Sequence, residues 1–194
     1  MIFDRTTPRL FLVAPDQQAA HVVACIKAAC AAGDVASLLL PPSLAREVTP
    51  MAQALGLAVM TTGEPRDVIH SHCDGLHADG ETENLADLRA AMGKNHILGV
   101  FAAGSRHFAM EAAEAGADYV ALNQNSASIG GEPIVKWCAE FLQIPCVAFA
   151  PVSPEALDTL LPQKPDFIRP ADAMWDSPES ARSITAQLMQ SLKA

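Results

Sequence analysis

The sequence has no cluster of lysine or arginine, and its 22 acidic residues outnumber its 13 basic ones. The formal net charge is −9 at pH 7. Sequence-independent binding of nucleic acid requires a basic surface that displaces counterions from the phosphates. We therefore expect no nucleic-acid partner.

Long hydrophobic runs are also missing. No segment approaches the roughly 20 apolar residues of a membrane-spanning helix. Residues 1–8 lack the basic region followed by an apolar run that a secretory signal has. We therefore expect no membrane association and a cytoplasmic location.

Cysteine is scarce, and no two of the five cysteines form a CxxC pair. In a reducing compartment this predicts free thiols, buried as small apolar residues. The run His70-Ser71-His72-Cys73, with His77 beyond it, contains metal-binding residue types. A strand at Gly75–His77 would place these side chains at opposite ends of the fold, whereas structural zinc needs converging donors. We therefore predict no metal site there.

What is present is enough for one core. The chain has 194 residues, which is too short for two ordinary catalytic domains. Of these residues 50% are hydrophobic and 18% charged, a composition typical of a compact globular protein. No linker, low-complexity tract or charge run divides residues 1–194, so we expect a single domain.

Short apolar runs alternate with segments of helical period from end to end. This alternation is typical of parallel strands, buried on both faces, that are each followed by a helix with one apolar side. The strand candidates are Leu10–Ala14, Ala36–Leu40, Leu57–Thr61, Gly75–His77, Ile97–Phe101, Tyr119–Asn123, Cys146–Phe149 and Phe167–Arg169. The helix candidates span about residues 18–32, 43–55, 65–71, 84–93, 105–116, 131–143, 154–161 and 178–191.

Residues typical of helix ends stand at the predicted boundaries. Predicted C-caps are Gly33, Gly56, Gly93 and Gly116, and predicted N-caps are Ser43, Asn84, Ser105, Ser153 and Ser177. Eight successive strand and helix units predict an α/β fold, a (β/α)8 TIM barrel. The alternative, an open doubly wound sheet, usually has a glycine-rich first turn, and this first turn is Ala14-Pro15-Asp16-Gln17-Gln18.

The sequence reads Asp74-Gly75-Leu76-His77 at the fourth strand candidate and Leu98-Gly99-Val100 at the fifth. These and several other segments resemble the thiamine-phosphate synthase family and the related thiazole tautomerase. Asp74-Gly75-Leu76-His77 matches the family's ADG(I/V)H motif, and Leu98-Gly99-Val100 its LGVS strand. Glu114–Val120 matches its (E)xGADY(V/I) motif, Leu10–Val13 looks like its opening strand, and Gln143–Ala148 fits the start of its IPVVAIGG strand. These are scaffold motifs, which specify a fold better than an activity.

The resemblance implies a reaction in which pyrophosphate leaves, so the site needs magnesium, cations and backbone N–H donors. Most of the residues that bind pyrophosphate and magnesium in the family have no counterpart in this sequence. Its QxRxK pattern corresponds to Leu38–Ser43, its Asn-Asp pair to Thr61–Glu64, and its TxTK loop to Asn123–Gly131. After the fourth strand only Asp79 and Glu81 could replace the carboxylate of its HxGQxD motif.

The seventh strand departs from the family most clearly. The family's Gly-Gly, whose N–H groups bind the thiazole phosphate, corresponds to Ala150-Pro151. Proline has no N–H, so one donor of that anion site is chemically absent. The histidine that a tautomerase needs just after the fifth strand falls on Ala103.

Polar residues at the carboxyl ends of barrel strands are the candidates for function. We predict catalytic roles for His77, Asp79 and Glu81, and substrate contacts from Thr61, Thr62, Asn123, Asn125, Ser126 and Arg169; Asp16, Gln124 and Asp172 share this rim. Arg169 suits a phosphate because a guanidinium binds phosphate in bidentate fashion, although an ion pair with Asp172 would also explain it. His77 suits acid or base chemistry only with a pKa near neutrality, and a hydrogen-bonded structural role is the alternative.

Aromatic residues near the rim allow two more expectations. Met174 and Trp175 could close over the mouth of the barrel or pack against a second subunit. Trp137, beside Phe141 on the helix after the sixth strand, is expected to pack that helix on the barrel.

Three hypotheses follow. The first is a divergent member of the family that binds a small phosphorylated ligand with little or no synthase chemistry and no cofactor. The second is a working synthase that uses magnesium and the displaced groups Asp79, Glu81 and Thr62. The third is a non-catalytic interaction module, such as a homodimer.

Overall fold

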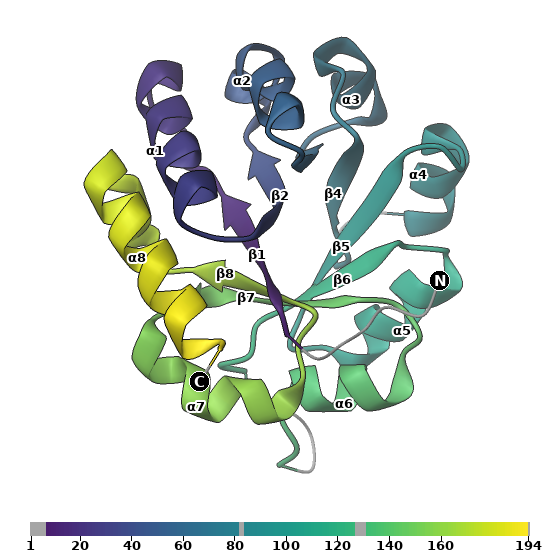
Figure 1. Ribbon diagram of the computed structural model, residues 1–194. Helices are drawn as coiled ribbons and strands as arrows, with labels where there is room; N and C mark the ends of the chain where they lie inside the picture. Colours follow the sequence, from purple (N-terminus) through teal and green to yellow (C-terminus); the bar gives the residue numbers. More distant parts are fainter. Residues whose placement is uncertain (1–6, 82–83, 127–130, 194) are drawn as a thin grey trace.

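Eight parallel strands close into a barrel in the computed structural model, which describes residues 7–81, 84–126 and 131–193. The strands follow one another around the barrel in chain order, and the helices form a ring outside it (Figure 1). The predicted single-domain TIM barrel is confirmed. No helix in the described ranges is long and apolar enough to cross a membrane.

The elements keep the predicted order. The strands are β1 (Arg9–Val13), β2 (Val35–Leu40), β3 (Ala58–Thr61), β4 (Gly75–Asp79), β5 (Ile97–Ala103), β6 (Tyr119–Leu122), β7 (Cys146–Val152) and β8 (Phe167–Pro170). The α-helices are α1 (Ala19–Ala32), α2 (Pro42–Ala54), α3 (Pro65–Ser71), α4 (Leu85–Met92), α5 (Arg106–Glu114), α6 (Ile134–Phe141), α7 (Leu157–Leu160) and α8 (Pro178–Ser191). Short 3-10 helices are η1 (Pro154–Ala156), η2 (Leu161–Gln163) and η3 (Asp172–Trp175).

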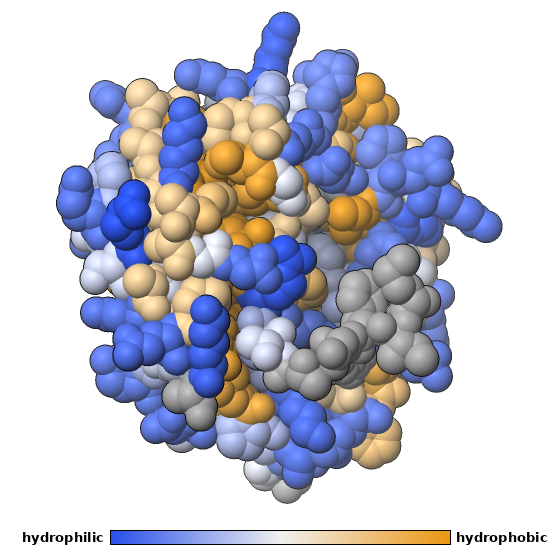
Figure 2. Space-filling model, in the orientation of Figure 1, coloured by the Kyte–Doolittle hydropathy of each residue, from blue (hydrophilic) through white to orange (hydrophobic). Residues whose placement is uncertain are grey.

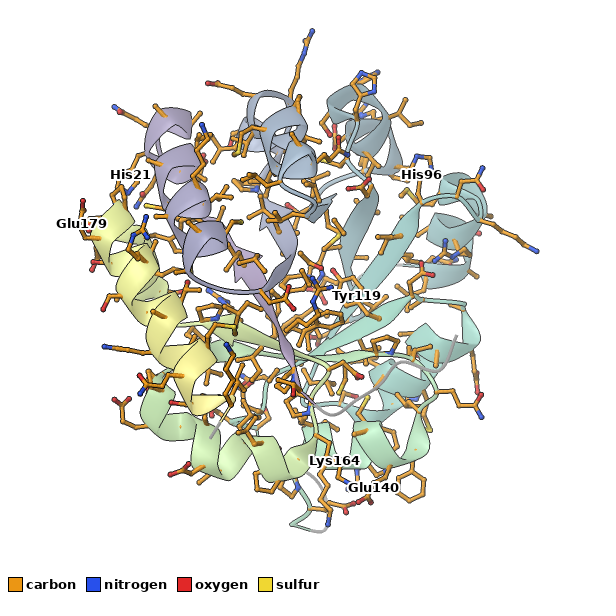
Figure 3. The ribbon with its side chains drawn as sticks, in the orientation of Figure 1. His21, His96, Tyr119, Glu140, Lys164 and Glu179 are labelled. Atoms are coloured by element: carbon orange, nitrogen blue, oxygen red, sulfur yellow. The ribbon has the colours of Figure 1, made fainter. Side chains whose placement is uncertain are left out.

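Two apolar cores result from the alternation of side chains along each strand. The larger core lies between the strands and the surrounding helices, and it includes Leu10, Leu12, Leu98 and Val120. The smaller one fills the barrel and includes Phe11, Met60 and Tyr119. Figure 3 shows the Tyr119 side chain near the centre of the ring of strands. The interior of the barrel is therefore a packed core.

Aspartates tie neighbouring strands together at the amino ends of the barrel. Asp74, Asp118 and Asp166 each stand directly before an even-numbered strand. Their carboxylates accept the backbone N–H groups of Val59, Leu98 and Cys146 on the preceding odd-numbered strands, at 2.7, 2.8 and 2.8 Å. Each aspartate N–H donates back to the carbonyl of the same residue. These reciprocal bonds stabilise the face opposite the mouth.

Some predicted helix ends differ from those observed. The side chains of Asn84, Ser105 and Ser177 cap their helices as predicted. Ser43 is not an N-cap, because its helix begins at Pro42, and the Ser43 hydroxyl donates to Asp16 instead. Gly33 has an extended φ of −167°, so it is not a left-handed cap. Its lack of a side chain matters because Met189 and Thr185 of α8 pack against it.

The helix predicted at about 154–161 is broken into η1, α7 and η2. Pro162 lies within this region and provides no N–H for a continuous α-helix. None of the five cysteines, all of which lie in the described ranges, forms a disulfide; four are buried, as predicted, and Cys30 is partly exposed.

Candidate functional site

A cavity of about 360 Å³ opens at the mouth of the barrel, where the carboxyl ends of the strands meet. Its lining is largely apolar and comprises Leu39, Thr62, Gly63, His77, Ala78, Asp79, Phe101 and Phe149. Three of the predicted site residues, Thr62, His77 and Asp79, are brought together here. The last two lie two positions apart on β4, so both face the interior.

Stacked rings form one wall of this mouth cavity. The Phe149 and His77 rings are 5.2 Å apart and nearly parallel, with an interplanar angle of 18°. Phe101 packs against Phe149 at a centroid distance of 5.3 Å. Such a wall favours a flat, apolar part of a ligand.

His77 is buried, and its Nδ1 lies 2.7 Å from the Tyr119 hydroxyl oxygen. Burial lowers the pKa of His77 from its usual 6.5 to about 4, although the nearby Asp79 opposes this shift. Burial also raises the pKa of Tyr119. The His77 ring is therefore neutral at physiological pH, and the near-neutral pKa that acid or base chemistry requires is not found. The hydrogen bond to Tyr119 agrees with the alternative prediction, a structural role for His77.

Arg169 provides positive charge beside the mouth cavity. Its guanidinium carbon lies 5.3 Å from the centroid of the Phe149 ring. Nη2 donates to Asp172 at 2.7 Å, and Nη1 donates to the Phe149 carbonyl at 3.3 Å. Nε is buried without a hydrogen-bond partner among the described residues. The predicted ion pair with Asp172 is confirmed, yet the guanidinium retains donor capacity that the described residues leave unused.

The end of β7 offers no anion site. The Ala150 N–H donates to the side-chain oxygen of Gln124 at 2.9 Å, and the Gln124 amide nitrogen donates to the Ala150 carbonyl at 2.7 Å. Pro151 follows and has no N–H. One backbone donor is thus occupied and the next is absent. Sequence reasoning placed Gln124 on the rim but missed this pairing, because only the fold brings the two residues together.

The remaining predicted site residues lie outside the lining of the mouth cavity. Thr61 is fully buried, and its hydroxyl donates to the backbone carbonyls of Leu40 and Thr62. The exposed Glu81 donates its N–H to Asp79. Asn123, Asn125 and Ser126 form a turn: the Asn123 side chain accepts from the Asn125 N–H, and the Ser126 N–H donates to the Asn123 carbonyl. Residues 127–130 of the predicted binding loop lie outside the described residues.

Carboxylates are sparse around the mouth cavity within the described residues. Magnesium keeps several of its waters and is usually held by one or two carboxylates together with substrate phosphates. Asp79 is the acidic residue that lines the mouth cavity, and one of its oxygens already accepts the Glu81 N–H. Within residues 7–81, 84–126 and 131–193, no group of three or more histidine, cysteine, aspartate or glutamate side chains could hold a metal ion.

A second rim cation, Arg106, escaped the sequence analysis. It is the first residue of α5, and the N-cap at Ser105 marks that position in the sequence. Its guanidinium lies over Trp137 at 5.1 Å, and Nη2 lies 3.3 Å from Glu132. These contacts draw its guanidinium toward Trp137 of α6 and Glu132 just before that helix, although its Nε, like that of Arg169, is buried without a hydrogen-bond partner among the described residues. Trp137 is buried in the core between the strands and the helices, so its predicted packing role is confirmed, whereas Phe141, on which it stacks, is 66% exposed.

Met174 and Trp175 do not cover the mouth or offer a contact surface. Both are buried in η3 and belong to the core between strands and helices. Figure 2 shows apolar and hydrophilic side chains interspersed over the visible face of the molecule.

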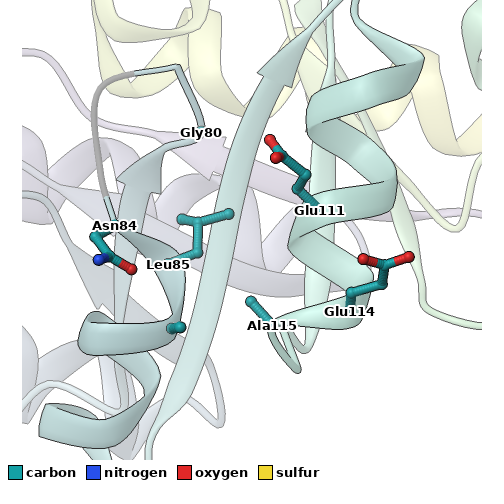
Figure 4. A pocket seen from close by; sticks show the side chains of 7 residues that line it. Gly80, Asn84, Leu85, Glu111, Glu114 and Ala115 are labelled. Atoms are coloured by element: carbon teal, nitrogen blue, oxygen red, sulfur yellow. The ribbon is translucent and has the colours of Figure 1, made fainter.

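Another groove, of about 390 Å³, lies between α4 and α5. Glu111 and Glu114 project from α5 on one side of it, and Asn84 lies on the other (Figure 4). Its two carboxylates would repel a phosphorylated ligand more strongly than the one carboxylate, that of Asp79, in the lining of the mouth cavity. Arg169, which lies against Phe149, also adds positive charge beside the mouth.

The fold and the site together define a TIM barrel with an aromatic mouth and one adjoining arginine. The model of the thiamine monophosphate synthase family matches residues 10–168. The chain therefore belongs to this family.

Named relatives agree. The chain is 32% identical to a thiamine-phosphate synthase of Rhodospirillum centenum, over 93% of this chain and 96% of that protein. It is 28% identical to one from Hyphomonas neptunium, over 97% and 96%. Among solved structures, the thiamine phosphate pyrophosphorylase of Pyrococcus furiosus has a TM-score of 0.78 at 16% identity, with 97% of each chain covered. This last similarity supports the fold alone.

Proposed function

We propose that this family member binds a small phosphorylated ligand at the mouth of the barrel and has little or no synthase activity. The observation that supports this most is the position of Arg169. It stands at the end of β8, next to Phe149 of the mouth cavity, and its Nε lacks a partner among the described residues. A buried, unpaired N–H is costly. A small movement of the Arg169 side chain toward the mouth would let this N–H and a second guanidinium N–H donate to a phosphate in bidentate fashion.

The same residues argue against displacement of pyrophosphate. A leaving pyrophosphate needs metal ions, several cations or backbone donors to stabilise its charge. No lysine or arginine is among the described residues that line the mouth cavity. Gln124 and Pro151 remove the donors at the end of β7. One guanidinium suits a monophosphate better than a pyrophosphate with magnesium.

Calorimetric titration with thiazole phosphate tests ligand binding. We expect the wild-type protein to bind, and Arg169→Gln to weaken binding by about 10-fold or more, because charge-assisted hydrogen bonds are lost. Arg9→Gln is a matched control, because Arg9 is also an ion-paired arginine but lies at the amino end of β1. Absence of heat at any accessible concentration, or equal affinity of the Arg169 variant and the wild type, would rule out the proposal.

A second candidate is an active synthase. The 32% identity to a thiamine-phosphate synthase over 93% of the chain favours it. In that case Asp79, Glu81 and Thr62 would have to replace the family's catalytic groups. Turnover of pyrimidine pyrophosphate and thiazole phosphate with magnesium, abolished in Asp79→Ala, would establish this candidate and exclude the first.

A further inference from the structure

Three neighbouring strands place a tyrosine behind His77 of the mouth cavity. His77 on β4 lies opposite Gly99 on β5, and Gly99 lies opposite Tyr119 on β6. The Tyr119 ring passes directly over Gly99, where an added Cβ would meet its Cζ at 2.0 Å. The absence of a side chain at position 99 therefore lets the tyrosine hydroxyl reach His77 across the intervening strand.

The hydrogen bond between these two side chains has one arrangement that leaves no fully enclosed donor unpaired. Both residues are buried, and His77 provides the one hydrogen-bond partner of the Tyr119 hydroxyl among the described residues. If Nδ1 carried the ring proton, the tyrosine hydrogen would be left unpaired in the interior, which is costly. The hydroxyl therefore donates to Nδ1, and the proton of the neutral ring resides on Nε2.

Nε2 faces the open part of the site. Nδ1 is engaged by Tyr119, whereas Nε2 has no hydrogen-bond partner among the described residues. It is also not among the fully enclosed polar atoms, and His77 lines the mouth cavity. The rings of Phe149, Phe11 and Tyr119 surround the imidazole, and Asp79 on the same strand is the nearby charged group.

We infer that Tyr119 is a positioning residue that fixes the tautomer of His77, so that Nε2–H is presented to the ligand as a neutral hydrogen-bond donor. The preferred ligand is then a planar ring that stacks on Phe149 and carries a hydrogen-bond acceptor toward His77. This statement about the ligand rests on the proposed function. The statement about the tautomer does not.

The tautomer is tested in the free protein. Two-bond proton–nitrogen NMR spectra at pH 7 distinguish a protonated ring nitrogen from an unprotonated one. We expect a protonated Nε2 and an unprotonated Nδ1 in His77. Tyr119→Phe should increase the population with a protonated Nδ1, because the donor to that atom is lost. The control Thr185→Val removes another buried hydroxyl, on α8, and should leave the His77 signals unchanged.

A proton on Nδ1 in the wild type would overturn the inference, as would an unchanged tautomer in Tyr119→Phe. The wild-type spectrum needs no variant, so misfolding of Tyr119→Phe would not prevent the test.

The ligand preference is tested with a matched pair of probes. Thiazole phosphate carries a ring nitrogen acceptor, whereas 2-phenylethyl phosphate lacks one. We expect the wild type to bind thiazole phosphate about 3- to 10-fold more tightly, as one neutral hydrogen bond provides. This ratio should fall toward unity in Tyr119→Phe.

The possible failures are distinguishable. Equal binding of both probes to the wild type overturns the ligand preference while phosphate binding stands. Binding of neither probe overturns the proposed function, and the ligand preference with it, while the NMR result still decides the tautomer.

Discussion

Arg169 shares its guanidinium with Asp172, whose carboxylate lies 2.7 Å from Nη2. Any phosphate at the mouth must compete with this carboxylate for the same donors. The Asp172 side chain is exposed, so the ion pair is worth little to folding. Its main effect is therefore on the charge that a ligand meets.

Removal of that competition should tighten anion binding. We expect Asp172→Asn to increase the affinity for thiazole phosphate by about 2- to 5-fold, the range of an exposed ion pair. Asp176→Asn removes the same charge from a residue of the same loop and should have a smaller effect. Calorimetry on both variants measures the difference, and unchanged affinity in Asp172→Asn would mean that Arg169 does not contact the phosphate.

Two buried threonines offer a matched comparison of stability. The hydroxyl of Thr185 has no partner among the described residues, whereas that of Thr49 donates to the Ala45 carbonyl. We expect Thr185→Val to stabilise the protein by about 1 kcal/mol and Thr49→Val to destabilise it by about 1 kcal/mol. Chemical denaturation gives both values. Destabilisation by Thr185→Val would show that its hydroxyl is satisfied after all.

Single residues at the mouth were only partly predictable. Arg169 and His77 could be assigned to the site because the end of a parallel strand marks the mouth of a barrel. Thr61 also stands at the end of a parallel strand, but its side chain is buried and its hydroxyl is hydrogen-bonded to a backbone carbonyl. The pairing of Gln124 with Ala150 depends on the fold, and no local pattern indicates it.

At the scale of elements, three aspartates, Asp74, Asp118 and Asp166, act as clamps between strand pairs. The Asp74 carboxylate accepts from the Val59 N–H at 2.7 Å and from the Gln53 amide at 3.1 Å. Its bond to Val59 connects β3 to β4 at the end opposite the site. The clamp thus supports the barrel without taking part in ligand binding.

Loss of the Asp74 clamp should leave a partly buried N–H unpaired. We expect Asp74→Ala to lower the free energy of unfolding by about 2 kcal/mol, and Asp74→Asn, which keeps an acceptor oxygen, by less than about 1 kcal/mol. Denaturant titration checks both variants, and affinity for thiazole phosphate should be unchanged in each. Equal losses would attribute the effect to charge rather than to the hydrogen bond.

The order and type of the elements were predictable because parallel strands and amphipathic helices have different periods. The residues at which the strands and helices end were less predictable. β7 runs to Val152, three residues beyond its predicted end, because its distal part pairs again with β8 after an irregularity. The broken helix after it reflects Pro162, which the helical period alone does not reveal.

At the scale of the whole molecule, the neutral His77 makes stability depend on pH. Its pKa is about 4 in the folded protein and 6.5 as the ordinary value, so the unfolded chain binds the proton more readily between these limits. Stability must therefore fall as the pH is lowered from about 6.5 to 4.

Removal of the imidazole isolates this contribution from those of the carboxylates. Between pH 7 and pH 4, the wild type should lose on the order of 3 kcal/mol more stability than His77→Gln. Unfolding measured across this range gives the difference. Parallel curves for the two proteins would show that His77 is not held neutral by burial.

The central claim is that the family's barrel is retained while its mouth suits a single phosphate and a flat ring. A crystal structure after soaking with thiazole phosphate and magnesium tests this most directly. We predict a phosphate within hydrogen-bond distance of Arg169, a ring against Phe149 and His77, and no ion at Asp79. A phosphate elsewhere on the rim, held by magnesium on Asp79 and Glu81, would contradict the account.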